Sequence, residues 1–141
     1  MKKSLAVAHV GSLLLLRENQ HTPTDADWDA FLEILILNRP NFPQLRILVA
    51  TDGGGPSPTQ IKRLAKALGG RSVRVAVVTD STRVRFITST IALLNSKIKS
   101  FFSSEIGKAY EHLGLTTAEQ RQSQQTLMQL EALIDPDLEG T

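Results

Sequence analysis

The fold is decided by residues 45–60, which read LRILVATDGGGPSPTQ. The aliphatic run from Leu45 to Ala50 has the length and character of a strand that a parallel sheet buries on both faces. Ser57, Pro58 and Gln60 then start a helix, with a serine at the N-cap, a proline at the first helical position and a glutamine at the third. A buried strand followed by a capped helix is the repeating unit of an α/β sheet.

The same unit recurs toward the C-terminus. The helix that Ser57 caps ends at Gly69-Gly70. Val73 to Thr79 is a second aliphatic strand, and Asp80 to Thr82 cap a further helix. Lys97 to Phe102 alternates as a last strand, and Ser103 is expected to cap a helix that ends at Gly114. Strands and helices therefore alternate through most of the chain.

Two strands and a helix precede this repeat. Leu5 to Val10 and Ser12 to Arg17, separated by Gly11, each have the length of a strand and predict a hairpin. Thr24 is a good N-cap for the helical periodicity that follows it. The sequence therefore predicts a single α/β domain over residues 1–115, with a mostly parallel sheet, an N-terminal antiparallel strand pair and helices packed on the sheet.

Residues 116–141 predict an additional C-terminal helix and a short tail. Gln120 to Gln125 is polar on every side, and an apolar stripe follows at Leu127, Leu130 and Ile134. Two placements are open for this helix. Its stripe covers the sheet of its own chain, or the helix protrudes and packs on a partner or on a second copy.

Composition excludes several classes of function. With 141 residues, 41% of them hydrophobic and 21% charged, the chain is an ordinary globular one, and a net charge of +2 predicts no nucleic-acid partner. The absence of cysteine excludes disulfides and thiol chemistry, and three scattered histidines predict neither a metal site nor a catalytic set. His9 interrupts the apolar N-terminal stretch, so we expect no signal peptide, no membrane span and a cytoplasmic location. We expect a protein without cofactor or enzymatic activity.

The order of elements over residues 5–114, with a polar turn after Ala50, resembles the STAS domain, which is named for sulfate transporters and anti-sigma-factor antagonists. The resemblance is to its short SpoIIAA-like relatives, which are sometimes grouped with CRAL-TRIO-type lipid-binding modules. It implies a regulatory module whose turn carries an Asp and, two residues later, a serine whose phosphorylation controls partner binding. Asp52 matches that Asp, but Gly54 stands at the serine position, so Ser57 and Thr59 are the nearest candidates for phosphorylation.

Two polar turns make up the candidate site for a partner or an anion. The first contains Asp52, Gly53, Gly54, Gly55, Ser57 and Thr59, and the second contains Asp80, Ser81, Thr82 and Arg83. Carboxyl ends of parallel strands meet at one edge of a sheet, and helix N-termini favour anions, so we expect both turns to face one cleft beside a reversal of strand order. Arg83 is expected to clamp an anion or a partner's carboxylate with Asp80 orienting it, or the two residues form a plain surface ion pair. The alternative is that Asp52 and Ser57 act only as turn and cap residues.

The leading hypothesis is therefore a non-enzymatic regulatory module that binds a protein partner through this edge, modulated by an anion or by phosphorylation. The alternative is a carrier of a small hydrophobic ligand, held between the first helix and the sheet by aromatic residues: Trp28, Phe31, Phe86, Phe101 and Phe102. A nucleotide-binding protein is a third reading, and the glycine turn alone favours it.

Overall fold

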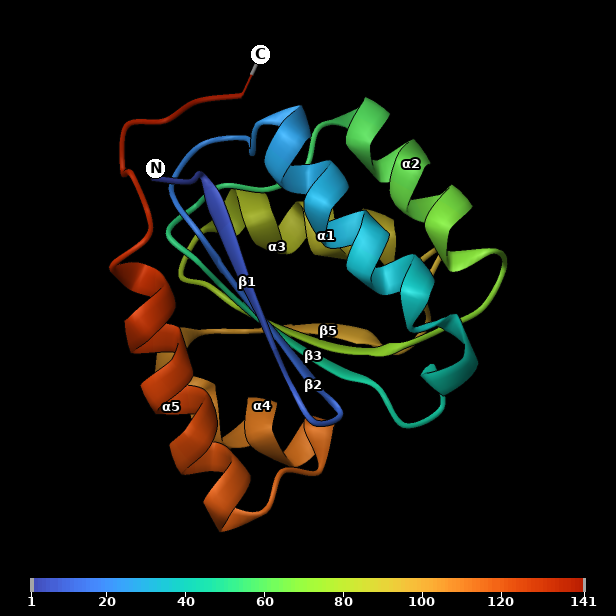
Figure 1. Ribbon diagram of the computed structural model, residues 1–141, viewed down its shortest axis with the longest axis vertical. Helices are drawn as coiled ribbons and strands as arrows, with labels where there is room; N and C mark the ends of the chain where they lie inside the picture. Colours follow the sequence, from blue (N-terminus) through green and yellow to red (C-terminus); the bar gives the residue numbers. More distant parts are fainter. Residues whose placement is uncertain (1, 141) are drawn as a thin grey trace.

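The chain forms one sheet with helices on both faces, as shown by a computed structural model that describes residues 2–140 (Figure 1). β1 pairs antiparallel with β2, and all other neighbours in the spatial order β1-β2-β3-β4-β5 are parallel. The strands are β1 (Leu5–Val10), β2 (Leu13–Glu18), β3 (Arg46–Thr51), β4 (Arg74–Val78) and β5 (Ile98–Phe101). The predicted fold class, a mostly parallel α/β domain with an N-terminal antiparallel pair and a C-terminal helix, is confirmed.

The helices begin and end close to the predicted residues. They are α1 (Asp25–Leu37), α2 (Pro58–Leu68), α3 (Thr82–Ile91), α4 (Ile106–Leu113) and α5 (Thr117–Glu131), with short 3₁₀ turns at η1 (Arg39–Asn41) and η2 (Ser103–Glu105). At α2 the capping box is complete, since Gln60 N donates to Ser57 Oγ at 3.2 Å and Ser57 N donates to Gln60 Oε1 at 3.0 Å. Gly69 ends the helix in the left-handed conformation that glycine permits, with φ +59°.

One predicted cap is wrong. Ser103 opens the 3₁₀ turn η2, and Glu105 occupies the N-cap position of α4. The Ser103 backbone N–H and hydroxyl both donate to the carboxylate of Asp80, at 3.0 and 2.6 Å. Ser103 therefore ties the end of β5 to the turn after β4.

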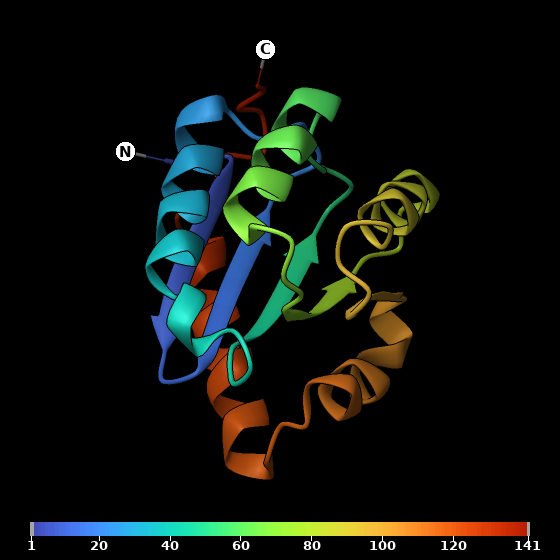
Figure 2. The same ribbon diagram turned by 90° about the vertical axis from the view of Figure 1, so that its right-hand side faces the viewer.

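Strand order decides which face of the sheet each helix covers. The sequence β2-β3-β4-β5 runs across the sheet in one direction, so right-handed crossovers carry α1, α2 and α3 to the same face. The opposite face is covered by α4 and α5, which gives three layers (Figure 2). None of the helices within residues 2–140 combines the length and the apolar character that a membrane span requires.

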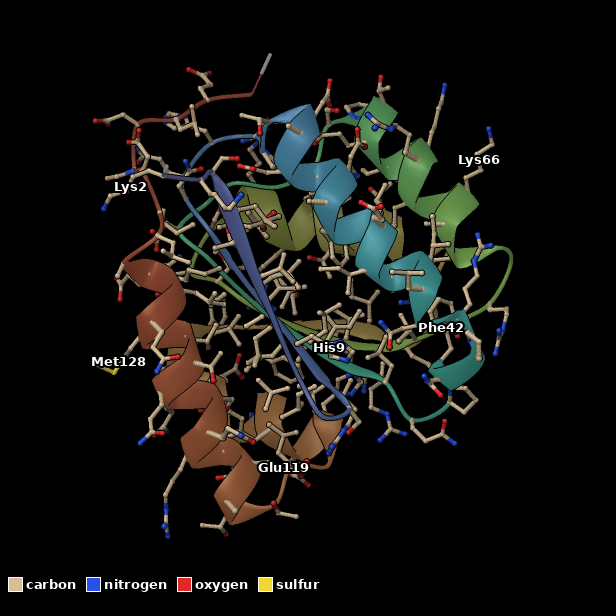
Figure 3. The ribbon with its side chains drawn as sticks, viewed as in Figure 1. Lys2, His9, Phe42, Lys66, Glu119 and Met128 are labelled. Atoms are coloured by element: carbon tan, nitrogen blue, oxygen red, sulfur yellow. The ribbon has the colours of Figure 1, made fainter. Side chains whose placement is uncertain are left out.

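The C-terminal helix packs on its own sheet, which is the first of the two placements considered. Leu130 and Ile134 are buried, Leu127 is partly buried, and all three pack in the core that includes Leu13 and Leu15 of β2. On the other side of α5, Met128 is 71% exposed and points away from the sheet (Figure 3). Leu127, Leu130 and Ile134 therefore contribute to the core of this chain and do not form a free docking face.

An ion pair joins the start of α5 to the first residue of β3, the central strand of the sheet. The Arg46 guanidinium donates to both carboxylate oxygens of Glu119, at 2.5 and 3.2 Å, and to Ser12 Oγ at 2.7 Å. Hydrogen bonds from Arg46, followed by the backbone N–H of Thr116, lower the pKa of Glu119 from 4.5 to about 2. A carboxyl whose pKa is lowered by folding stabilises the fold above its unfolded pKa, and that contribution is lost as the pH falls toward 2.

We expect Glu119→Gln to lower the free energy of unfolding by about 1 kcal/mol at pH 7, because glutamine keeps the capping geometry and loses the charge. The difference from the unmodified protein should shrink as the pH falls from 5 toward 2, measured by urea unfolding. Glu131→Gln on the same helix is the control, since its carboxylate is 65% exposed and 3.7 Å from Arg17. Equal losses in the two variants at pH 7 would contradict the assignment.

Candidate functional site

The two polar turns meet at the carboxyl edge of the sheet, following β3 and β4. A Cβ atom placed on Gly53 would lie 3.9 Å from the Cβ of Ser81, and one on Gly55 would lie 3.1 Å from Ile87 Cδ1 in α3. The loop between β3 and α2 therefore lies directly against the start of α3. Carboxyl ends of adjacent parallel strands produce this proximity.

The backbone of the first turn is committed to bonds within the protein. Asp52 N donates to Glu18 O, Gly53 N to Thr51 Oγ1 and Gly54 N to Asn19 O, at 3.2, 3.2 and 2.9 Å. These three N–H groups are not available to cradle an anion. This geometry agrees with the alternative reading of the turn, in which its polar residues satisfy the local backbone.

The two candidate hydroxyls of this turn differ in exposure. Ser57 is half-buried and its Oγ caps α2, whereas Thr59 is exposed in the first helical turn. A phosphate on Thr59 would lie near the helix N-terminus without displacing the cap. Of the two predicted phosphorylation sites, Thr59 is the more accessible.

The carboxylates of both turns already have partners. Asp52 accepts two hydrogen bonds from Arg17 Nη2, both at 2.9 Å. Asp80 accepts from the hydroxyl and the backbone N–H of Ser103, and these bonds lower its pKa. The expectation that Asp80 orients Arg83 is therefore wrong. Ser81 caps α3 by accepting from Val84 N at 3.3 Å, while Thr82 and Arg83 are exposed.

The expected cleft beside a reversal of strand order is also wrong. Crevices of that kind form where adjacent crossovers leave a sheet in opposite directions. The order β1-β2-β3-β4-β5 contains no reversal, so α1, α2 and α3 lie side by side over one face.

A cavity of about 70 Å³ lies beneath these three helices, between them and the sheet. Its lining is apolar except at a few positions and comes from strands, helices and the glycine turn: Leu16, Glu18, Trp28, Phe31, Leu35, Ile47, Val49, Gly54, Gly55, Pro56, Leu64, Leu68, Val73, Val75, Val77, Val84, Ile87, Thr88, Ile91, Asn95 and Ile98. The expected aromatic lining is correct for Trp28 and Phe31 only. Phe86 and Phe102 are exposed, and Phe101 packs with the core on the opposite face of the sheet.

Glu18 is the acidic residue among those lining this cavity. Side chains alternate along β2, so Leu14, Leu16 and Glu18 face α1 to α3 while Leu13 and Leu15 face α4 and α5. Glu18 is 4% exposed, and its carboxyl has no hydrogen-bond or ion-pair partner among residues 2–140. Burial raises its pKa from 4.5 to about 8, opposed in part by the positive charge of Arg17.

The sequence contains a signal for Glu18 that the predicted strand missed. That strand ended at Arg17, whereas β2 continues through Glu18. One further residue of alternation places Glu18 on the same face as Leu14 and Leu16, where a charge is unexpected. A buried carboxyl with a raised pKa beside a cavity makes Glu18 a candidate functional residue.

Other candidate chemistry is dispersed. His9 lies in β1, His21 in the loop before α1, and His112 in α4, where its Nε2 lies 3.1 Å from Val75 O and 3.0 Å from Lys97 O. Within the described part of the chain, no group of three or more His, Asp or Glu side chains is arranged to hold a metal ion.

Comparison with known proteins yields no matching family model, curated protein or solved structure. The resemblance to STAS domains therefore rests on the order of elements and the polar turn, and it stays a prediction.

Proposed function

We propose that this protein is a non-enzymatic regulatory module that binds a protein partner through the outer side of α3 and the turn before it. The observation that carries the proposal is a set of exposed apolar side chains beside the Asp80 turn. Phe86 is 75% exposed and Leu93, seven residues further along, is 86% exposed. Phe86 lies in α3 and Leu93 in the turn that follows the end of this helix at Ile91. The two exposed side chains are close in the chain, and we propose that they contact one partner surface.

Phe102 and Arg85 extend this α3 surface, which we define as Arg85, Phe86, Leu93 and Phe102. The Arg85 guanidinium lies 3.9 Å from the centre of the Phe102 ring, and Phe102 is 44% exposed. Aromatic and arginine side chains are enriched at protein interfaces, where they supply most of the binding energy. Arg83 is exposed beside this surface, and Arg85 lies near the Glu105 carboxylate, which favours a partner segment that is apolar and carries an acidic group facing Arg83.

Phosphorylation of Thr59 belongs to the same proposal. The loop that precedes it lies against α3 at Gly53 and Gly55, so a phosphate on Thr59, in the first turn of α2, would add nearly two negative charges at the same edge of the sheet. An acidic partner would then be repelled. A Thr59→Ala variant that responds to the host's kinases as the unmodified protein does would remove this part of the proposal.

The test is crosslinking and affinity purification from the native host with the unmodified protein and two variants. Phe86→Ser should reduce recovery of a specific partner at least about tenfold, the effect of losing an interface anchor of about 2 kcal/mol. Met128→Ser is the matched control, because Met128 is 71% exposed on the opposite layer and should leave recovery unchanged. Equal recovery with both variants would contradict docking on the α3 surface.

A carrier or sensor of a small apolar ligand is the second candidate function, and the cavity under α1 to α3 favours it. Ligand pockets are largely apolar with a few placed polar groups. Native mass spectrometry of protein purified from its host should show a retained small molecule. A mass equal to that of the bare chain in every preparation would count against a tightly held ligand, whereas a weakly held one is tested by titration.

A further inference from the structure

We propose that the cavity binds a small uncharged molecule with an apolar body of a few heavy atoms and one hydrogen-bond acceptor, which is anchored by the Glu18 carboxyl. The proposal rests on the second candidate function and names its ligand class. Its basis is a juxtaposition: a buried carboxyl without a partner in the described chain borders an apolar cavity.

The size of the cavity sets the size of the ligand. A single water needs about 10–15 Å³, and an engineered apolar cavity of about 150 Å³ binds benzene. A volume of about 70 Å³ therefore suits a ligand of about three or four heavy atoms, by interpolation. Short-chain ketones, aldehydes and alcohols have this size.

Glu18 is the polar group of the cavity that is left to recognise the ligand. Thr88 Oγ1 donates to Val84 O at 2.9 Å, and the Asn95 side chain is bonded to both the N–H and the C=O of Val73. The remaining lining is aliphatic, aromatic, glycine or proline. A protonated carboxyl in such surroundings can donate one hydrogen bond to a ligand oxygen.

The charges around Glu18 favour an uncharged ligand. Trp28 and Phe31 from α1, Val49 from β3, and Val84 and Ile87 from α3 carry no charge, and Glu18 is the titratable residue in the lining. The charge that acts on it is that of Arg17, the next residue on its own strand, whose guanidinium is bound to Asp52. A charged ligand would lose its hydration and find no network of polar groups in the cavity to replace it, which costs several kcal/mol.

The experiment is a methyl NMR titration with acetone, isopropylamine and acetate, which have four heavy atoms each, followed at the Val84 and Ile87 methyl groups. We expect acetone to bind with a millimolar Kd and both charged probes to bind at least about tenfold more weakly. Because ionisation removes the donor, affinity for acetone should fall at least about tenfold between pH 6 and pH 9.5.

Three variants separate the contribution of the hydrogen bond from that of the ionisable charge. Glu18→Gln keeps a neutral hydrogen-bond donor, so we expect binding within about threefold of the unmodified protein and no loss at high pH. Glu18→Leu should lose binding about tenfold at pH 6. Glu33→Gln removes an exposed carboxylate from α1 and should change nothing.

Each contrary result has a defined meaning. Undiminished binding by Glu18→Leu, or tighter binding of isopropylamine that rises with pH, would overturn the anchor and ligand class while leaving a cavity that binds ligands. No shift with any probe at 100 mM would overturn the ligand site and count against the carrier function as well. Neither result bears on docking at the α3 surface, which Phe86→Ser tests separately.

Discussion

Gly54→Ala is expected to destabilise the protein by about 3 kcal/mol or more, or to prevent folding. A Cβ atom at this position would lie 2.0 Å from the backbone oxygen of His21 and 2.6 Å from that of Asn19. Both contacts are with backbone, which cannot rotate away as a side chain can. The loop between β3 and α2 would have to leave the chain segment after β2, breaking the hydrogen bond from Gly54 N to Asn19 O.

Gly107→Ala is the matched control. Gly107 lies in α4, and a Cβ atom there meets no other atom within 4 Å. Alanine favours a helix over glycine by up to about 1 kcal/mol, so this variant should be as stable as the unmodified protein or slightly more so. Urea unfolding followed by circular dichroism measures both variants. A Gly54→Ala protein within 1 kcal/mol of Gly107→Ala would show that the turn does not pack tightly on residues 19–21.

The elements of the fold were predictable because their signals are local. Ser57, Pro58 and Gln60 specify a helix start within four residues, and Gly69 specifies its end. The aliphatic runs ending in polar turns likewise marked β3 and β4. The predicted cap at Ser103 was wrong because a residue that can cap a helix can equally bond to a distant partner, here Asp80.

Strand order and the position of α5 depend on long-range pairing and could not be predicted in the same way. The contact between Arg46 and Glu119 spans 73 residues, and no local pattern in either segment indicates it. A stripe of Leu127, Leu130 and Ile134 fits a sheet or a partner equally well. The strands follow one another across the sheet in one direction, which leaves one face without crossover helices. Only this strand order determines that α5 packs on the sheet of its own chain.

The candidate site was predictable in position and not in chemistry. Both polar turns lie at the carboxyl edge and approach each other at Gly53 and Ser81, as adjacent parallel strands require. The side chains of Asp52 and Asp80 were expected to face a ligand, yet their partners Arg17 and Ser103 come from segments whose pairing only the tertiary structure determines. Roles in partner binding and phosphorylation remain predictions for these turns.

Glu18→Leu is expected to stabilise the protein by about 3 kcal/mol at pH 7, the second large effect. In the folded chain burial raises the pKa of Glu18 to about 8, against 4.5 for the ordinary carboxyl. At pH 7 the folded protein therefore holds a proton that the unfolded chain has released. Leucine removes this cost and extends the apolar face of Leu14 and Leu16.

The pH dependence distinguishes this cause from a general gain in hydrophobicity. Between pH 4.5 and about 8 the folded state binds more protons than the unfolded state, so the free energy of unfolding falls as the pH rises. The unmodified protein should lose roughly 3 kcal/mol across this range relative to Glu18→Leu, with Glu18→Gln following the leucine variant in slope. Glu33→Gln should keep the slope of the unmodified protein, because Glu33 is exposed. Parallel profiles for all four proteins in urea unfolding at pH 5, 6.5 and 8 would show that Glu18 ionises normally. Profiles that differ as expected would show that the protein keeps a buried carboxyl at a cost in stability, which is what a functional role for Glu18 requires.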